Sequence, residues 1–249
     1  MLRHRIIPCL LLLNEGLVKT QQFKNPKYVG DPTNAIRIFN EKEVDELIIL
    51  DIKASKEGRE PNFKLIENLA GECFMPLCYG GGISNIDQVR RLFSIGVEKI
   101  CIQTAAINNI KLITEIADKF GKQAITVSVD VKKDWLGRYH LHSYTRGIDK
   151  KEPWLDWMKS AVKAGAGEII LNCVDNDGMM KGMNLDLIRL AAKAINVPLI
   201  AIGGVGSIAD IRAGIDAGAS AVSAGSFFVF HGPHRAVLIT YPEYERFNF

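Results

Sequence analysis

Cysteine and histidine are scarce in this sequence, and neither is spaced as metal ligands are. The five cysteines, Cys9, Cys73, Cys78, Cys101 and Cys173, are odd in number and include no CxxC pair. Most lie in apolar runs typical of strands, so we expect buried, reduced thiols in a cytoplasmic protein and no disulfide framework. Of the five histidines, His140 and His142 are two residues apart, which suits one face of a strand or hairpin better than a metal site. The sequence therefore predicts no metal and no other cofactor.

The sequence also lacks a large charge excess and an apolar run long enough to span a bilayer. Its 31 basic and 28 acidic residues give a net charge of +3, without a Lys/Arg block, which argues against a nucleic-acid or membrane partner. Arg3 and Arg5 followed by the apolar residues 6–13 imitate a signal peptide. No small-residue cleavage site follows, and residues 14–16 (Asn-Glu-Gly) end the run, so we interpret it as a first strand.

Short apolar runs alternate with amphipathic segments along the 249 residues. The expected strands lie near 5–12, 46–51, 76–79, 98–103, 124–130, 168–173, 198–202 and 220–225, and the expected helices near 32–44, 62–72, 86–95, 109–119, 153–165, 184–195 and 207–217. This alternation is typical of parallel βαβ units. Eight such units in a chain of this length predict an α/β fold with one domain over residues 1–249, a (βα)8 TIM barrel. A doubly wound open sheet is the alternative, but no GxGxxG follows the first strand.

Two glycine turns lie about 120 residues apart in matching surroundings. Residues 198–207 form an apolar run that ends in glycines before a helix start, and residues 76–84 repeat this pattern. Thr104 and Ser226 keep the same spacing. Glycines before a helix let backbone N–H groups approach a phosphate, although such turns also occur without a ligand. We therefore predict two similar halves, about 1–120 and 121–249, and a ligand with a phosphate at each end.

In a (βα)8 barrel the carboxyl ends of the strands form the active face. This expectation places a defined set on one rim: Leu11, Asp51, Gly80, Gly81, Gly82, Gln103, Thr104, Asp130, residues 175–178, Gly203, Gly204, Gly225 and Ser226. The strand starts face the opposite rim and carry alternating charges at Arg5, Glu46, Lys99 and Glu168. These four could close into an ion-pair ring around the barrel axis, or they could be ordinary surface charges at strand entries.

Three further segments carry structural expectations. Residues 14–31, with Lys19, Lys24 and Lys27, form a long loop on the active rim and are a lid candidate. Residues 131–152 indicate a small hairpin with Gly137 at its turn. Residues 231–234 could open a short helix facing a phosphate, and Pro242 breaks any last helix early.

At these motifs the chain resembles the cyclase subunit of imidazole glycerol phosphate synthase. The matching residues are 5–10, 18–19, 30–32, 45–47, 50–52, 80–83, 104–106, 112–117, 165–169, 177–178 and 203–204. The resemblance implies a glutaminase subunit docked at the amino-terminal rim, whose ammonia crosses the barrel axis to a bis-phosphate substrate. It implies an ammonia gate of Arg5, Glu46, Lys99 and Glu168. It also implies phosphate binding by Gly81, Gly82, Gln103, Thr104, Asp177, Gly178, Gly203, Gly204, Gly225 and Ser226.

The chain departs from the family pattern at the position of one catalytic group. The family uses two carboxylates, at the ends of strands one and five, as general acid and base. Asp130 matches the strand-five carboxylate, but the strand-one position holds Leu11, which cannot transfer a proton. Lys19, the lid lysine, is kept. Gln103 replaces an Asn, and Met179 and Lys53 replace hydroxyl residues; Lys53 could pair with Asp51 or bind an anion.

Three functions follow from this pattern. The favoured one is an ammonia-delivering barrel in acetamidino-sugar synthesis for surface polysaccharides, because the pattern resembles the paralogous branch of the family found with surface-polysaccharide genes. The resemblance implies that such a barrel works with a glutaminase and a separate ATP-dependent amidotransferase. An ammonia conduit needs the gate but not both carboxylates. The first alternative is an active cyclase of histidine biosynthesis, in which Asp130 works with Asp51 or Asp177. The second is a non-catalytic scaffold that binds a phosphorylated ligand and activates its glutaminase.

Overall fold

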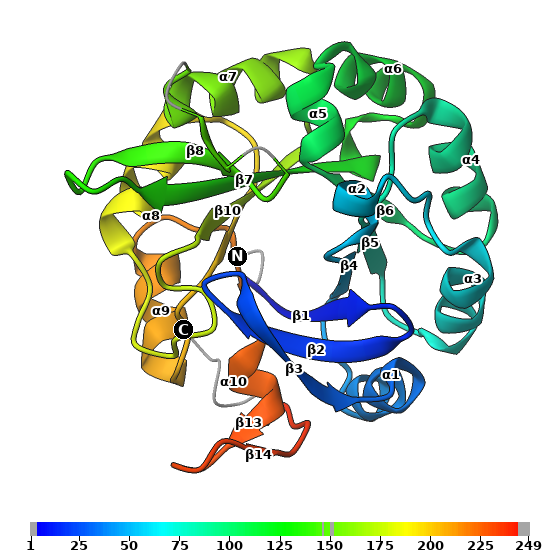
Figure 1. Ribbon diagram of the computed structural model, residues 1–249, viewed down its shortest axis with the longest axis vertical. Coiled ribbons are helices and arrows are strands. Elements are labelled where there is room, and N and C mark those ends of the chain that lie inside the picture. Colours follow the sequence, from blue (N-terminus) through cyan, green and yellow to red (C-terminus); the bar gives the residue numbers. More distant parts are fainter. Residues whose placement is uncertain (1–3, 146, 150–151, 244–249) are drawn as a thin grey trace.

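The chain folds into a closed barrel of parallel strands ringed by helices (Figure 1). The computed structural model describes residues 4–145, 147–149 and 152–243, so Arg3 and the tail after residue 243 lie outside the described residues. The barrel strands are β1 (Arg5–Leu13), β4 (Leu47–Asp51), β5 (Leu77–Gly80), β6 (Lys99–Ile102), β7 (Ile125–Lys133), β10 (Glu168–Cys173), β11 (Leu199–Ile202) and β12 (Ala221–Ala224). Each pairs in parallel with the next, and β12 pairs with β1 to close the barrel. The predicted (βα)8 barrel is confirmed.

Amphipathic helices form the outer ring. They are α1 (Pro32–Glu41), α3 (Phe63–Glu72), α4 (Ile86–Ser94), α6 (Lys111–Phe120), α7 (Trp154–Ala164), α8 (Leu185–Ala194) and α9 (Ile208–Asp216). Side-chain oxygens cap several of them: Asn85 accepts from two backbone N–H groups at the start of α4, and Ser207 accepts from the Asp210 N–H at the start of α9. None of the helices in the described ranges has the length and apolar character needed to cross a bilayer.

Corresponding elements of the two halves start at positions separated by the spacing of the sequence repeat. The starts of β5 and β11, at Leu77 and Leu199, have the same spacing as those of β6 and β12, at Lys99 and Ala221. The short helices α5 (Thr104–Asn108) and α10 (Ser226–Val229) correspond in the same way. Together with α2 (Ala54–Glu57) and a 3-10 turn (Lys122–Ala124), they were not predicted, because four or five residues are too few for a periodic pattern.

Two sequence expectations about connections are wrong. The lid loop at 14–31 is a hairpin of β2 (Gly16–Gln21) and β3 (Lys24–Gly30), and β2 pairs with β1. Within the described residues, β2 is therefore paired on both sides, with β1 and β3, and β3 forms an edge of the sheet. Residues 231–234 open no helix: β13 (Phe230–His231) and β14 (Ala236–Val237) form a small hairpin there. The predicted hairpin after strand five is present as β7 and β8 (Tyr139–Ser143), extended by β9 (Gly147–Asp149).

The eighth unit has no long helix in its described part. After α10 the chain forms the β13–β14 hairpin and returns to the barrel, where buried Tyr241 stacks on Phe228 with ring centroids 5.0 Å apart. The Tyr241 hydroxyl donates to the Ile6 carbonyl at 3.2 Å. One aromatic residue thus covers part of the seam between β12 and β1 in place of a helix.

Inward-facing residues alternate along each strand and form layers inside the barrel. Along β1 they are Arg5, Ile7, Cys9 and Leu11. An interior apolar cluster joins Ile7, Cys9, Ile48, Cys78, Cys101, Ile170, Ile200 and Ala221. All five cysteines are free thiols, and four are buried as predicted, whereas Cys73 after α3 is only half-buried. The interior therefore passes from a charged layer at the strand starts, through an apolar layer, to the polar carboxyl end.

Candidate active site and ion-pair ring

A cavity of about 200 Å³ opens at the carboxyl ends of the barrel strands. It is lined by nearly every residue that the sequence placed in a site on this rim: Leu11, Lys19, Asp51, Gly81, Gln103, Thr104, Asp130, Asp177, Gly178, Gly203, Gly204, Gly225 and Ser226. Asp175 and Asn176 of the predicted rim do not line it, and neither does Gly82. The Gly82 backbone N–H donates to the Ser55 hydroxyl at 3.2 Å, beside the cavity.

The cavity also contains residues that sequence reasoning did not select. Phe23, at the tip of the β2–β3 hairpin, and Tyr144, after β8, have ring centroids 6.4 Å apart and both line the mouth. Ser128 and Asn172 lie deeper, on β7 and β10. The inward alternation along β7 and β10 could have identified Ser128 and Asn172. Nothing in the sequence pairs Phe23 with Tyr144, because hairpin packing brings them together.

Asp130 is a buried carboxylic acid held by polar neighbours. Burial raises its pKa to about 7, against the lowering effect of hydrogen bonds from Gln103, Ser128 and Asn172. The Gln103 amide donates to its Oδ2 at 2.5 Å, and the Ser128 hydroxyl donates to its Oδ1 at 3.1 Å. A carboxyl group that titrates near neutral pH can both give and take a proton there.

The side chain of Gln103 already has two hydrogen-bond partners at this acid. Its side-chain amide donates to Asp130 and also, at 3.3 Å, to the backbone carbonyl of His142 on β8. The amide therefore joins β6 to the β7–β8 hairpin. Its place in the predicted phosphate-binding set rests on the resemblance alone.

Leu11 lines the same cavity on β1, next to Leu50 of β4. Both side chains are apolar, so β1 contributes no proton-transfer group at this end. Asp177 is the other acid with a raised pKa in the cavity: burial raises it to about 6, while Lys19 and Thr20 oppose the shift. Asp130 and Asp177 are therefore the two groups in the described cavity lining that combine an acidic side chain with a pKa moved toward neutrality.

Lys19, on β2, has a buried side-chain amino group. Its Nζ donates to the Cys9 carbonyl at 2.6 Å, and a Cβ on Gly225 would lie 2.6 Å from the same nitrogen. Burial lowers its pKa, partly offset by Asp177. Within the described residues, no carboxylate oxygen lies within 4.0 Å of this nitrogen. An anion bound beside this amino group would stabilise its charged form, which burial disfavours, so the group favours an anion in the cavity.

Asp51 lines the cavity, but its oxygens already have partners. Oδ1 accepts from the backbone N–H groups of Lys53 and Ala54, each at 3.0 Å, and so fixes the start of α2. Its ion-pair partner is Arg59, at 3.5 Å, and not the Lys53 side chain that the sequence suggested. This carboxylate orders a turn, which leaves it less available for proton transfer than Asp130.

The glycine turns come close to neighbouring backbone. Gly81 has φ +114°, and a Cβ there would lie 2.4 Å from the Asp51 carbonyl oxygen. Gly204 has φ +102°, and a Cβ would lie 2.1 Å from the Gly182 carbonyl oxygen. No side chain fits at either position, so glycine is required by the fold as well as suited to a close ligand approach.

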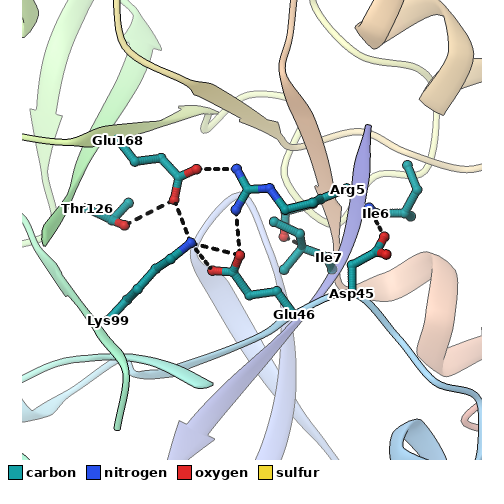
Figure 2. Close-up of polar contacts among 9 residues, drawn as sticks. Arg5, Ile6, Ile7, Asp45, Glu46, Lys99, Thr126 and Glu168 are labelled. Carbon is teal, nitrogen blue, oxygen red and sulfur yellow. Dashed lines mark hydrogen bonds and ion pairs between the residues drawn. The ribbon is translucent and has the colours of Figure 1, made fainter. Parts of the chain in front are cut away.

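Four charged side chains meet at the amino end of the barrel (Figure 2). Arg5 bridges the two carboxylates: Nη1 lies 2.5 Å from Glu46, and Nη2 bonds Glu168. Lys99 bridges them from the other side, at 2.9 Å from Glu46 and 3.3 Å from Glu168. Both carboxylates are buried, whereas Arg5 and Lys99 are partly exposed. The ion-pair geometry is confirmed, and the alternative of separate surface charges is wrong.

The ring is held in place and adjoins the cavity. Thr126 donates to Glu168 at 3.4 Å, and the Ile6 N–H donates to Asp45 at 2.9 Å (Figure 2). Burial would lower the pKa of Lys99, but Glu168 and Glu46 together raise it, so the lysine stays charged. Ile48 and Ile170 line the cavity floor two residues after Glu46 and Glu168. One apolar layer therefore separates the ring from the cavity.

Comparisons with known proteins support a relationship over the whole described barrel. The family described as "Histidine biosynthesis protein" matches residues 5–234. The chain is 54% identical to a provisionally named imidazole glycerol phosphate synthase subunit hisF2 of Pseudomonas aeruginosa, over 100% of this chain and 99% of that protein. It is 50% identical to a provisionally named subunit HisF of Leptospira borgpetersenii, covering 97% and 96%. It is 41% identical to imidazole glycerol phosphate synthase subunit HisF of Dictyoglomus turgidum, covering 92% and 91%.

Proposed function

Because this chain belongs to the histidine biosynthesis protein family, among the HisF-like subunits of imidazole glycerol phosphate synthase, we propose that it carries ammonia through its barrel. A glutaminase subunit at the amino-terminal face supplies the ammonia. A phosphorylated acceptor in the carboxyl-end cavity, or a protein that holds it there, receives it. The free thiols of its five cysteines fit a cytoplasmic protein.

The observation that carries this proposal is the order of layers along the barrel axis. The ring of Arg5, Glu46, Lys99 and Glu168 closes the amino end, and the cavity with Asp130 begins one apolar layer above it. A buried ion-pair network of this kind contributes little net stability compared with apolar side chains of similar volume. The position of this network across the barrel axis is therefore better explained by control of ammonia passage through the barrel than by a contribution to folding stability. An apolar layer lets neutral ammonia pass and disfavours the ammonium ion.

Loss of one ring member is expected to uncouple glutamine hydrolysis from ammonia use. Glu46→Ala or Lys99→Ala leaves the other ring charges without their partners, so ammonia escapes at the interface instead of crossing. We expect glutamate formed per acceptor converted to rise several-fold in the complex with the glutaminase. Glu72→Ala is the matched control, since it breaks the exposed Arg37–Glu72 pair outside the barrel. Normal coupling in both ring variants would leave the ring a structural feature only.

The amino-terminal face presents one large apolar side chain for the glutaminase. Phe74, in the loop between α3 and β5, is 86% exposed, so its ring is available to pack against a partner protein, and aromatic side chains often carry much of the binding energy of an interface. Phe74→Asp is expected to weaken binding of the glutaminase subunit at least about tenfold, measured by titration calorimetry. Tyr28→Asp is the control, because Tyr28 is exposed on β3 at the opposite face. Equal affinity of Phe74→Asp and the unmodified chain would place the docking surface elsewhere.

We place the acceptor's phosphates at two subsites of the cavity. The first anion subsite comprises Gly81, Gly82, Gln103 and Thr104, and the second anion subsite comprises Asp177, Gly178, Gly203, Gly204, Gly225 and Ser226. The buried Lys19 amino group lies against Gly225 of the second subsite, which supports an anion there, because an anion would stabilise the charged form that burial disfavours. Asp130 is the group proposed to move a proton during attack by ammonia.

The acceptor proposed first is an acetamidino-sugar precursor of a surface polysaccharide, with a separate ATP-dependent amidotransferase at the carboxyl face. Leu11 supports this choice, because ammonia delivery does not require the second carboxylate that ring closure uses. The second candidate is the cyclase of histidine biosynthesis, which the neutral-range pKa values of Asp130 and Asp177 favour. A non-catalytic scaffold that activates the glutaminase would need only the anion subsites.

One assay separates these candidates. The purified chain is incubated with ammonium salt and the cyclase substrate, the ribulosyl-formimino aminoimidazole carboxamide ribotide. Robust turnover would establish the histidine reaction with a rearranged acid–base pair. Absence of turnover, together with phosphate binding, would leave two candidates, ammonia delivery and activation of the glutaminase. The amount of glutamate formed per acceptor converted then distinguishes these two.

A further inference from the structure

Through Arg235, the C-terminal hairpin of β13 and β14 contacts the turn after β10. Arg235 lies between β13 and β14, and its guanidinium donates to two successive carbonyls of that turn, Gly178 at 3.4 Å and Met179 at 3.0 Å. In Figure 1 this hairpin (red) lies beside α10 and β3, away from the helix ring. The segment that was expected to open a helix facing a phosphate thus contacts this turn from outside the cavity lining.

The turn that Arg235 contacts is packed between two hairpins. On its other side, a Cβ on Gly178 would lie 2.0 Å from the Thr20 carbonyl oxygen of β2, and the Gln22 N–H donates to the Asp177 carbonyl at 2.9 Å. The two hairpins also touch each other, since Lys27 Nζ of β3 lies 5.4 Å from the ring centroid of Phe230. The position of Gly178 is therefore set jointly by β2 and by Arg235.

The backbone of Arg235 is strained in the conformation that makes this contact. Its φ is +49°, a left-handed conformation that is unfavourable for any residue other than glycine. Met180, which follows the contacted turn, also has positive φ, at +58°. Two carbonyl oxygens receive a planar, permanently charged donor here, and a lysine cannot reproduce that two-point contact. The bonds to the turn offset the strain.

We propose that Arg235 is a positioning residue for the second anion subsite. It fixes the Asp177–Gly178 turn through the Gly178 and Met179 carbonyls and adds positive charge behind it. This inference rests on the proposed function, because it assumes that an anion binds at that turn. The first anion subsite lies at the turns after β5 and β6 and has no described contact with Arg235, so it serves as an internal reference.

The test is a titration of the full chain with inorganic phosphate, followed by NMR at the backbone amides of Gly178, Gly203 and Gly204 and of Gly81 and Gly82. Arg235→Met is expected to weaken phosphate binding at the second subsite about tenfold and to leave the first unchanged. Arg235→Lys keeps the charge but not the two-point contact, so it should recover only part of the loss. Arg37→Met is the control, because it removes the same charge from an exposed surface of α1.

Every other result of the phosphate titration would contradict a specific part of this proposal. Unchanged affinity in Arg235→Met, or an equal loss at both subsites, would show that Arg235 does not position the second subsite. Full recovery by Arg235→Lys would reduce its role to charge alone. Failure of the unmodified chain to bind phosphate at either turn would overturn the anion subsites of the proposed function as well. Thermal unfolding of each variant reports whether the fold is intact.

Discussion

Leu11→Asp is expected to raise ammonia-dependent turnover of the histidine-pathway cyclase substrate by about 10²- to 10⁴-fold over the unmodified chain. Leu11 lines the same cavity as Asp130, on β1, and the remaining polar groups there stay in place. The substitution adds a second proton-transfer group on β1, where Leu11 is apolar. Ring closure with C–N cleavage needs one group to give a proton and another to take one. Consumption of the substrate at saturating ammonium salt measures the gain.

Leu11→Asn is the matched control for this gain. Asparagine has nearly the same size and polarity as aspartate but cannot transfer a proton at neutral pH. It should therefore remain as inactive as the unmodified chain. Equal activity of the two variants would mean that polarity or altered packing, and not acid–base chemistry, limits the reaction. No gain in either variant would mean that the cavity no longer binds this substrate productively.

Asp130→Asn is expected to have opposite effects on activity and stability. In the Leu11→Asp background, it should reduce turnover by about 10²- to 10⁴-fold, because it removes the buried acid that titrates near neutrality. Asp51→Asn is a comparison within the same cavity, since Asp51 mainly orders the start of α2. Turnover that survives Asp130→Asn would remove Asp130 from the mechanism, whatever the effect on stability.

The stability effect follows from the raised pKa of Asp130. Between its ordinary value of 3.8 and about 7, the folded protein keeps a proton that the unfolded chain has released. Stability therefore falls as the pH rises through this window, and asparagine removes that fall. We expect Asp130→Asn to be more stable than the parent by up to about 4 kcal/mol above pH 7, with the difference vanishing below pH 4. Urea unfolding at pH 4 and pH 8 measures it, and equal differences at both pH values would contradict the raised pKa.

Elements with strong periodicity were predictable within one or two residues at most of their ends. Parallel strands buried on both faces are short apolar runs, and each surface helix has a clear apolar stripe, so both signals are local. The β2–β3 hairpin gave no such signal, because β3 is mostly exposed and contains Lys24, Pro26 and Lys27. It is stabilised by pairing with β1 rather than by its own pattern. The β13–β14 hairpin, with two residues in each strand, is below the length at which alternation can be read.

The candidate site was predictable where strand direction alone places residues. The positions of the strand ends predicted most of the cavity residues, and the alternating charges at the strand starts predicted the ion-pair ring. The hydrogen bond from Gln103 to Asp130, the burial of Lys19 and the reach of Arg235 depend on contacts between segments far apart in sequence. Arg235 and Gly178 are 57 residues apart, so no local pattern joins them. Such contacts also determine the pKa values and explain why the sequence could not supply them.

The closure of the barrel has a consequence for how the chain forms during synthesis. β1 finds one of its two barrel neighbours in β12, where Ile7 pairs with Ser223, and Tyr241 bonds Ile6 across 235 residues of chain. On a ribosome, the first strand therefore waits with an open edge until almost the whole polypeptide has emerged. Such long-range pairing predicts slow folding and an aggregation-prone nascent state. A chain truncated before Ala221 should remain a substrate for chaperones, because its first strand can never complete the sheet.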